Sequence, residues 1–526
     1  MHRPTLLPLL ALCLAACAPV SKSEAPPKVA PRQMARARAP EPPWRREPVE
    51  AEARGERQTR PVLIRGAKLL LGDGKIIERG HVLLAGGKIE SVGAGDGEAP
   101  ANAEIVEVAG KVVTPGLIDT HSHIGVYAQP QARANDDGNE ATAPVAASVR
   151  ALDAFWAQDP AIDRAVAGGV TTIQVLPGSA NLIGGRAVTL KLRRATTARG
   201  MRFAGAPEGL KMACGENPKR VYGERKQAPS TRMGNLAGQR EAFLGAKRLI
   251  ESWRTWRVAE QKRVDEFNDK RAEVAAERSE RSARKRWCES QQDRAKRRQC
   301  EGWQREWAKE ELEDPKIADE TLPPERNLGA ETLAGVLEGK ILLQVHCYRT
   351  DDMMRMLALS DEMGVSIRSF HHALDAYKIR DELARRGVAV STWADWWGFK
   401  LEAYDGIPEN LALLESAGGR PVVHSDSPEG IQRLNQEAAK ALWSGRHSGV
   451  AVDPERAITW ITSNPAWVLG VDHRVGTLAR GKDADVVVWS ADPMSVYSRA
   501  ELVYIDGVLR FDAKSSGRTS DYEVAP

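Results

Sequence analysis

The chain has 526 residues, of which 42% are hydrophobic and 28% are charged. These proportions are typical of a folded globular protein, and they exclude a wholly disordered chain and a protein with many membrane spans. The length predicts one large domain with additional segments. The formal net charge of +4 arises from 75 basic and 71 acidic residues, a near balance that indicates no nucleic-acid partner.

The first residues have the features of a bacterial export signal. An apolar run from Thr5 to Ala16 follows a short basic start and precedes Cys17, and it is shorter than the roughly 20 residues that span a bilayer. The segment before and including Cys17 resembles the lipobox of bacterial lipoproteins, which implies removal of residues 1–16 and a lipid on Cys17. By analogy with lipoproteins that are sorted by the following position, Ala18 implies attachment to the outer membrane. An uncleaved or unlipidated signal is the alternative.

Residues 17–60 are rich in Ala, Pro, Arg and Glu and are predicted to form a disordered tether, because they have too little apolar surface to fold. Residues 61–113 and 475–514 alternate apolar and polar side chains around short glycine turns, which is typical of β-hairpins. Two β-rich flanks around a long middle predict one composite β-sandwich built from both ends of the chain.

The middle of the chain, residues 114–474, alternates strand-like apolar runs with helical stretches. This order favours a parallel α/β fold, most simply an eight-stranded (β/α)₈ barrel. Neither Gly nor Pro occurs between Ala246 and Glu301, so we expect a helical insertion over residues 240–320. A single helix over that stretch would be about 84 Å long, which favours a helical hairpin. Cys288 and Cys300 are able to pair only if the chain doubles back between them.

Histidines and one acidic residue follow the apolar runs of the predicted barrel. His121 and His123 are two residues apart on a strand and therefore project to one face. His346, the pair His371-His372, and Asp426 come at the ends of later strands, where barrels carry their catalytic groups. Imidazole nitrogens and carboxylates are ligands for Zn²⁺, so the pattern predicts a metal site with one or two divalent ions.

Several motifs together resemble the metal-dependent amidohydrolase superfamily, in its imidazolonepropionase-like and prolidase-like branch. These are the Thr-Pro-Gly-Leu-Ile-Asp-Thr-His-Ser-His segment at 114–123, His346, His372 with Asp375, Ser425-Asp426-Ser427, and segments at 463–466 and 481–485. The resemblance implies a distorted TIM barrel with a composite β-sandwich. It also implies that His121, His123, His346, His372 and Asp426 bind metal and that Asp426 acts as the general base, with His372 as a further catalytic residue.

Lys211 determines how many metal ions the site would hold. The segment from Leu210 to Gly215 resembles the fourth strand of prolidase-like relatives, in which a carboxylated lysine bridges two metals. Carboxylation requires a neutral amine, and burial favours that form. A surface lysine without this role is the alternative.

Other assignments stay open on the residues alone. His371 and His372 cannot both point inward, and His424 is either a ligand or a group behind the ligands. A substrate pocket is predicted from Arg186 and from the aromatic loop with Trp393, Trp396 and Trp397, where loop packing is the alternative.

The predicted function is hydrolysis of a carbon–nitrogen bond in an amide, a cyclic amide or a peptide. Alternatives are an Xaa-Pro-type or other dipeptidase, an ester hydrolase, and a catalytically degenerate binding protein of the cell envelope. Residues 281–300 hold eight basic residues against Glu289 and Asp293, which suggests an envelope partner for the helical insertion or a solvated helix face. A homo-oligomer is left open.

Overall fold

The computed structural model describes residues 36–46, 56–316 and 321–515. The predicted signal, Cys17 and most of the predicted tether lie outside the described residues. The chain divides into two compact units, one of residues 1–41 with 253–324 and one of residues 42–252 with 325–526. Within the described ranges, no helix has the length and apolar character needed to cross a membrane.

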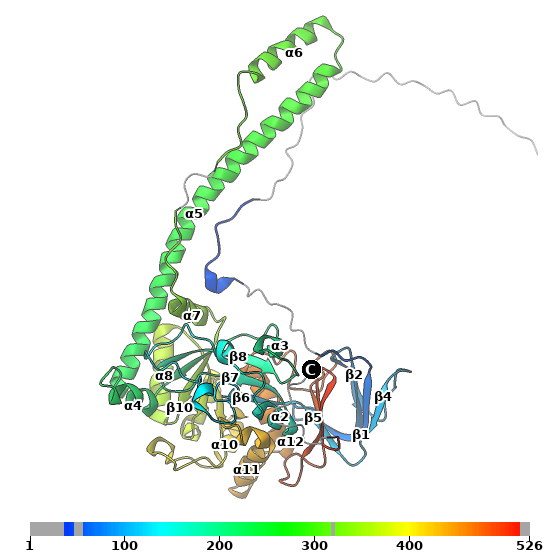
Figure 1. Ribbon diagram of the computed structural model, residues 1–526, viewed down its shortest axis with the longest axis vertical. Coiled ribbons are helices and arrows are strands. Elements are labelled where there is room, and N and C mark those ends of the chain that lie inside the picture. Colours follow the sequence, from blue (N-terminus) through cyan, green and yellow to red (C-terminus); the bar gives the residue numbers. More distant parts are fainter. Residues whose placement is uncertain (1–35, 47–55, 317–320, 516–526) are drawn as a thin grey trace, which may run out of the picture. The chain divides into compact units, whose positions relative to one another are not determined.

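The larger unit contains a barrel-like sheet of eight strands in sequential order (Figure 1). Its strands are β6 Leu117–Ser122, β7 Val170–Val175, β8 Ile183–Lys191, β9 Gly209–Ala213, β10 Leu342–Cys347, β11 Ile367–His372, β12 Ala389–Thr392 and β13 Arg420–Val423. All neighbours are parallel except that β8 is antiparallel to both β7 and β9. The expected distorted (β/α)₈ barrel is therefore confirmed, and β8 is where it departs from the parallel pattern.

Apart from α5, Arg232–Glu289, the helices of the larger unit lie between the barrel strands in the chain or, for the last three, after β13. They are α1 Ala151–Ala154, α2 Ala161–Ala167, α3 Ala198–Met201, α4 Glu216–Glu224, α7 Leu328–Leu337, α8 Thr350–Met363, α9 Arg380–Arg386, α10 Asn410–Ser416, α11 Leu434–His447, α12 Pro454–Ala457 and α13 Ser463–Val468. Gly364 and Gly387 end α8 and α9 in the left-handed conformation, which glycine adopts without steric cost. Each lies just before a barrel strand, so these helix ends direct the chain into β11 and β12.

A second sheet joins both ends of the chain, as expected (Figure 1). From the N-terminal side come β1 Val62–Leu70, β2 Ile76–Ala85, β3 Lys88–Ala94, β4 Glu104–Glu107 and β5 Val112–Pro115, and from the C-terminal side β14 Val486–Trp489, β15 Ala500–Ile505 and β16 Val508–Asp512. The two halves meet where β5 pairs antiparallel with β14. Side chains from both halves share one apolar core, in which Ile64, Val113, Val486 and Val488 are fully buried.

Lys191 on β8 connects the barrel to this second sheet. Its buried ammonium group lies 2.7 Å from Asp483 and 3.2 Å from Asp485, and it also contacts Asp506. The charge of Lys191 holds the pKa of Asp483 at about 2, although burial of that carboxylate acts in the opposite direction. A buried charge is tolerated only when it is paired, so this cluster makes the position of the sheet on the barrel specific.

The helical segment is a hairpin, as expected, and its first helix is much longer than its second. Helix α5 runs without a break from Arg232 to Glu289, 58 residues, which is about 87 Å. Helix α6, Arg294–Trp307, begins where the Asp293 side chain accepts hydrogen bonds from the backbone of Ala295 and Lys296. The chain then doubles back between the two helices, as expected for a hairpin, and a disulfide joins Cys288 to Cys300.

Part of the predicted tether is ordered. The backbone N–H and C=O of Ala37 bond to the side chain of Asn268, and the Ala39 N–H donates to Gln261. Farther along, Pro43–Arg45 form a turn of 3₁₀ helix, and Arg45 forms an ion pair with Glu338. The prediction of disorder therefore fails for residues 36–46, because side chains distant in the sequence satisfy backbone groups of this segment.

Candidate metal centre

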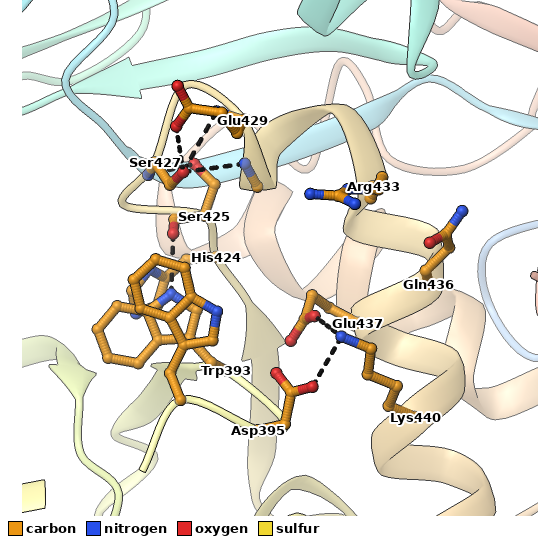
Figure 2. A pocket seen from close by; sticks show the side chains of 12 residues that line it. Trp393, Asp395, His424, Ser425, Ser427, Glu429, Arg433, Gln436, Glu437 and Lys440 are labelled. Atoms are coloured by element: carbon orange, nitrogen blue, oxygen red, sulfur yellow. Dashed lines mark hydrogen bonds and ion pairs between the residues drawn. The ribbon is translucent and has the colours of Figure 1, made fainter. Parts of the chain in front are cut away.

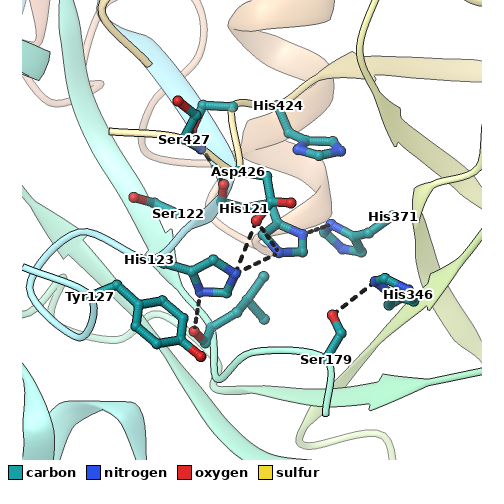
Figure 3. A network of polar contacts seen from close by, with 12 residues as sticks. His121, Ser122, His123, Tyr127, Ser179, His346, His371, His424, Asp426 and Ser427 are labelled. Atoms are coloured by element: carbon teal, nitrogen blue, oxygen red, sulfur yellow. Dashed lines mark hydrogen bonds and ion pairs between the residues drawn. The ribbon is translucent and has the colours of Figure 1, made fainter. Parts of the chain in front are cut away.

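The predicted ligands meet at one end of the barrel, because each lies on a strand or directly after it. His121 is on β6 with His123 just beyond, Lys211 is on β9, His346 on β10, His372 on β11, and Asp426 follows β13. Figure 3 shows the side chains of His121, His123, Asp426 and His346 directed into a common space. The strand-end pattern thus brings residues from five strands together.

His123 carries its free lone pair on Nε2. Its Nδ1 lies 2.8 Å from the carbonyl oxygen of Leu176, and a carbonyl only accepts, so Nδ1 of the neutral ring carries the proton. The Nε2 atom is therefore an acceptor, and it lies 3.0 Å from a carboxylate oxygen of Asp426.

His121 also has its free lone pair on Nε2, because the side chains of Gln344 and His371 determine its tautomer. Nε2 of His371 lies 2.8 Å from the amide oxygen of Gln344, so this nitrogen carries the proton of the His371 ring. Nδ1 of His371 is left as an acceptor, and it lies 2.9 Å from Nδ1 of His121. His121 therefore donates from Nδ1 and directs a lone pair on Nε2 into the site.

The two lone pairs face each other at the distance expected for ligands of one ion. Nε2 of His121 and Nε2 of His123 are 3.3 Å apart, and two such nitrogens in tetrahedral coordination at 2.0–2.1 Å are separated by about 3.3 Å. No proton lies between them in these tautomers. Together with Asp426 their ligand atoms lie within 4.8 Å of one another, so the donor set fits a divalent cation such as Zn²⁺.

Asp426 is ionised and held in a strained conformation. Burial acts to raise its pKa, but electrostatic interactions with neighbouring residues, Lys211 among them, hold the pKa below its usual value. Its φ is +51°, in the left-handed region that non-glycine residues avoid. Its backbone N–H donates to the carbonyl oxygen of His121, which fixes the carboxylate beside the two histidines.

Lys211 is fully buried and has no carboxylate within ion-pair distance among the described residues. Its ammonium group donates to the carbonyl oxygen of Pro177 at 3.0 Å and lies 3.5 Å from Nε2 of His121. Burial lowers its pKa to about 8. A neutral amine beside the ligands is what carboxylation requires.

His346 and His372 lie on the opposite side of the site from His123. Nδ1 of His346 contacts the hydroxyl of Ser179 at 2.8 Å, and its Nε2 is buried with no hydrogen-bond partner. Nδ1 of His372 is likewise unpartnered and lies 3.9 Å from Asp426. The structure therefore separates the neighbouring histidines: His372 faces the site, and His371 lies behind His121.

The ring of His424 lies close to the rings of both His371 and His372. Its Nε2 accepts the backbone N–H of His372 at 3.3 Å, so Nδ1 carries the proton, and that N–H is buried without a partner. Burial lowers the pKa of His424 to about 3, which keeps the ring neutral. This tautomer gives His424 a buried N–H donor at Nδ1 that has no partner among the described residues.

The other predicted pocket residues divide into two groups. Trp393 stacks on His372 and on Trp396 at centroid distances of 4.7 and 5.0 Å. Trp397 is 59% exposed and, unlike Trp393 and Trp396, does not line the cavity that lies next to the metal centre. Arg186 is not brought to the site, because its guanidinium group pairs with Glu208.

Sequence reasoning missed several supporting residues. Asp119 accepts hydrogen bonds from the backbone and hydroxyl of Ser425 and from the backbone of His121, and burial raises its pKa to about 7. It lies two residues before His121, a spacing that places both side chains on one face of β6 and that could have identified it. A disulfide also joins Cys214, directly after β9, to Cys347, the last residue of β10.

Comparisons with known proteins show to which family the chain is similar. The profile of the amidohydrolase family matches residues 374–516. The crystal structure of an amidohydrolase from Thermotoga maritima is 33% identical, with a TM-score of 0.67 over 86% of this chain and 100% of that chain. The amidohydrolase tasK of Hapsidospora irregularis is 33% identical over 84% of this chain and 40% of its own length. An imidazolonepropionase from Thermoplasma volcanium is 27% identical over 32% of this chain and 41% of its own length. The matched regions are less than half of these last two proteins.

Proposed function

Because the chain belongs to the amidohydrolase family, we propose that it hydrolyses a carbon–nitrogen bond of an amide, a cyclic amide or a peptide. One observation carries the proposal: the lone pairs on Nε2 of His121 and Nε2 of His123 face each other, and the ionised carboxylate of Asp426 lies beside them. These residues would hold a divalent cation, Zn²⁺ by the chemistry of the donors, with His346 and His372 as further ligands. A second cation would need a carboxylated Lys211.

A divalent cation bound there would act as a Lewis acid, lowering the pKa of water and polarising a carbonyl group. Asp426 is the general base in this proposal. Because its pKa is lowered, the carboxylate is ionised at neutral pH and has no proton of its own, so it is able to accept one. It would then return that proton to the leaving nitrogen. The N–H of His424, buried and unpartnered, is suited to donate to the substrate oxygen as charge develops there.

The immediate test is metal content and hydrolysis by the purified full chain. We expect one or two divalent ions per chain and turnover of some member of a panel of N-acyl amino acids, dipeptides and cyclic amides, with Zn²⁺, Mn²⁺ and bicarbonate supplied. Chelation should abolish that turnover, and resupply should restore it. Failure to retain any divalent ion after reconstitution would support the degenerate binding protein instead, whereas turnover confined to dipeptides or to esters would favour those alternatives.

We also propose that the protein is exported and anchored through Cys17 to the outer membrane. In support, the four cysteines that follow Cys17 form two disulfides, Cys214–Cys347 and Cys288–Cys300, and disulfides persist in oxidising compartments. Labelling of cells with a palmitate analogue should mark the wild-type protein and not Cys17→Ser, and equal labelling of both would contradict the anchor.

The helical segment would contact an anionic component of the envelope. Arg281 and Arg284 are held by glutamates on the same segment, but Lys285, Arg286, Arg294 and Arg298 are exposed around the turn between α5 and α6. Reversing these four charges should release the protein from anionic vesicles if this proposal is correct.

A further inference from the structure

A cavity of about 280 Å³ lies beside the metal centre, bounded by the loops after β12 and β13 and by the start of α11 (Figure 2). His424 and Ser425, which directly precede Asp426 in the chain, form part of its wall. Asp426 is not itself a lining residue, so the cavity lies beside the metal centre and shares with it the wall formed by His424. Its volume is at the lower limit of ligand sites, which suits a group of the size of one amino acid.

Most charged groups of this cavity are already paired. The ammonium group of Lys440 lies 2.8 Å from Asp395 and 2.5 Å from Glu437, and Glu437 also accepts the backbone N–H of Ala394. Glu429 is at the exposed rim and accepts a hydrogen bond from Ser427. The carboxylates of Asp395, Glu437 and Glu429 therefore already have hydrogen-bond or ion-pair partners within the protein.

Arg433 is the exception. Figure 2 shows its guanidinium group extending from the helical turn toward the loop that carries Ser425 and Ser427. It makes no hydrogen bond or ion pair with any residue that the structure describes. A guanidinium group presents a rigid fork of donors that matches a carboxylate, and because Arg433 is exposed its fork is open to a ligand.

The opposite wall is aromatic. The indole of Trp393 is fixed by a hydrogen bond to the carbonyl oxygen of Ser425 at 2.8 Å, and Trp396 stacks on it with an interplanar angle of 13°. Trp396 is 39% exposed, so an apolar group is able to pack against it from the cavity.

We infer that this cavity binds a carboxylate-bearing, amino-acid-sized part of the substrate, with Arg433 holding the carboxylate and the two indoles packing on an apolar side chain. The inference rests on the proposed function, and it narrows the substrate class to N-acyl amino acids and peptides with a free carboxyl end. Neutral amides and cationic amines would be poorer ligands, because they leave the guanidinium group unpaired.

The test uses binding, so that it does not depend on hydrolysis. Phenylpropanoate, phenylpropanol and phenylpropylamine share one apolar body and have no amide bond, and their affinities for the full chain are measured by calorimetry after chelation, so that binding to metal does not contribute. We expect the carboxylate to bind best and Arg433→Met to weaken its binding by about ten- to one-hundredfold. Arg433→Lys should restore part of that loss.

Arg480 provides a matched control, because it is 81% exposed in its side chain and lies far along the chain in the turn before β14. Arg480→Met should bind all three ligands as the wild type does. Equal binding of carboxylate and alcohol by the wild type, a preference for the amine, or an unchanged carboxylate affinity in Arg433→Met would each overturn the inference. Because hydrolysis is not measured, an inactive enzyme that still prefers the carboxylate would contradict only the proposed function.

Discussion

Nδ1 of His371 lies 2.9 Å from Nδ1 of His121, so a histidine that does not face the site sets the tautomer of one that does. Gln344 determines the direction of this relay by accepting from the other nitrogen of His371. Such supporting contacts orient a ligand and raise its basicity.

Replacing His371 should therefore weaken metal binding without removing a ligand. We expect His371→Leu to raise the dissociation constant for Zn²⁺ by about 10–100-fold, measured by competition with a chromogenic chelator. His447 is exposed on α11 and serves as the control, since His447→Leu should leave the constant unchanged. An unaltered constant in His371→Leu would show that the relay does not orient His121.

Asp426→Asn should separate binding from turnover. The amide keeps the size of the carboxylate and one oxygen, so we expect a folded protein that retains metal in part, with kcat lowered by about 10²–10⁴-fold because proton transfer is lost. Metal analysis and initial rates on the same preparation are the measurements. A rate near that of the wild type would remove Asp426 from the role of general base.

Activation of the metal-free protein should depend on pH through Lys211. The carboxylated form arises from the neutral amine, and with a pKa of about 8 the neutral fraction rises from roughly a tenth at pH 7 to roughly nine-tenths at pH 9. At constant dissolved CO₂ and metal, the initial rate of activation should therefore increase about tenfold over that interval. Lys211→Met should lose the dependence on CO₂, and activation of the wild type without CO₂ would argue for a single-metal site.

The two disulfides should contribute unequally to stability. Cys214 and Cys347 are 133 residues apart, and Cys288 and Cys300 are 12 apart. Loop entropy predicts about 5 kcal/mol for the first and about 3 kcal/mol for the second. Unfolding by guanidinium of the two double Cys→Ser variants measures the difference. Only the Cys214/Cys347 variant should also lose metal affinity, because that disulfide joins the strand ends beside Lys211 and His346; equal effects on metal binding would contradict this.

Much of the site was predictable because a barrel places strand ends together whatever their separation in sequence. That rule alone located His121, His346 and Asp426, which come from β6, β10 and the end of β13. It could not distinguish His371 from His372, since neighbouring residues on a strand point to opposite faces and only the contact with Gln344 shows which face is which. Likewise, the free guanidinium of Arg433 is visible only when the partners of its neighbours are known.

The helical segment shows a different limit. Absence of Gly and Pro predicted helix correctly, but the turn depends on Asp293 capping α6 and on contacts between the two helices, such as that of Trp287 with Trp303. Residues 36–46 were misjudged for a related reason: composition reports how much apolar surface a segment can bury by itself, and not that Asn268 and Gln261 bond to its backbone.

The pairing of β5 with β14 has a consequence for how the chain folds. Val113 and Val488 are partners in this ladder, although the whole barrel separates them in the sequence. Contacts between such distant residues form slowly, because a long loop must close first. The strands before the barrel therefore have an unpaired edge until the last strands arrive. During synthesis, that edge is where a chaperone would be needed to prevent pairing with another chain.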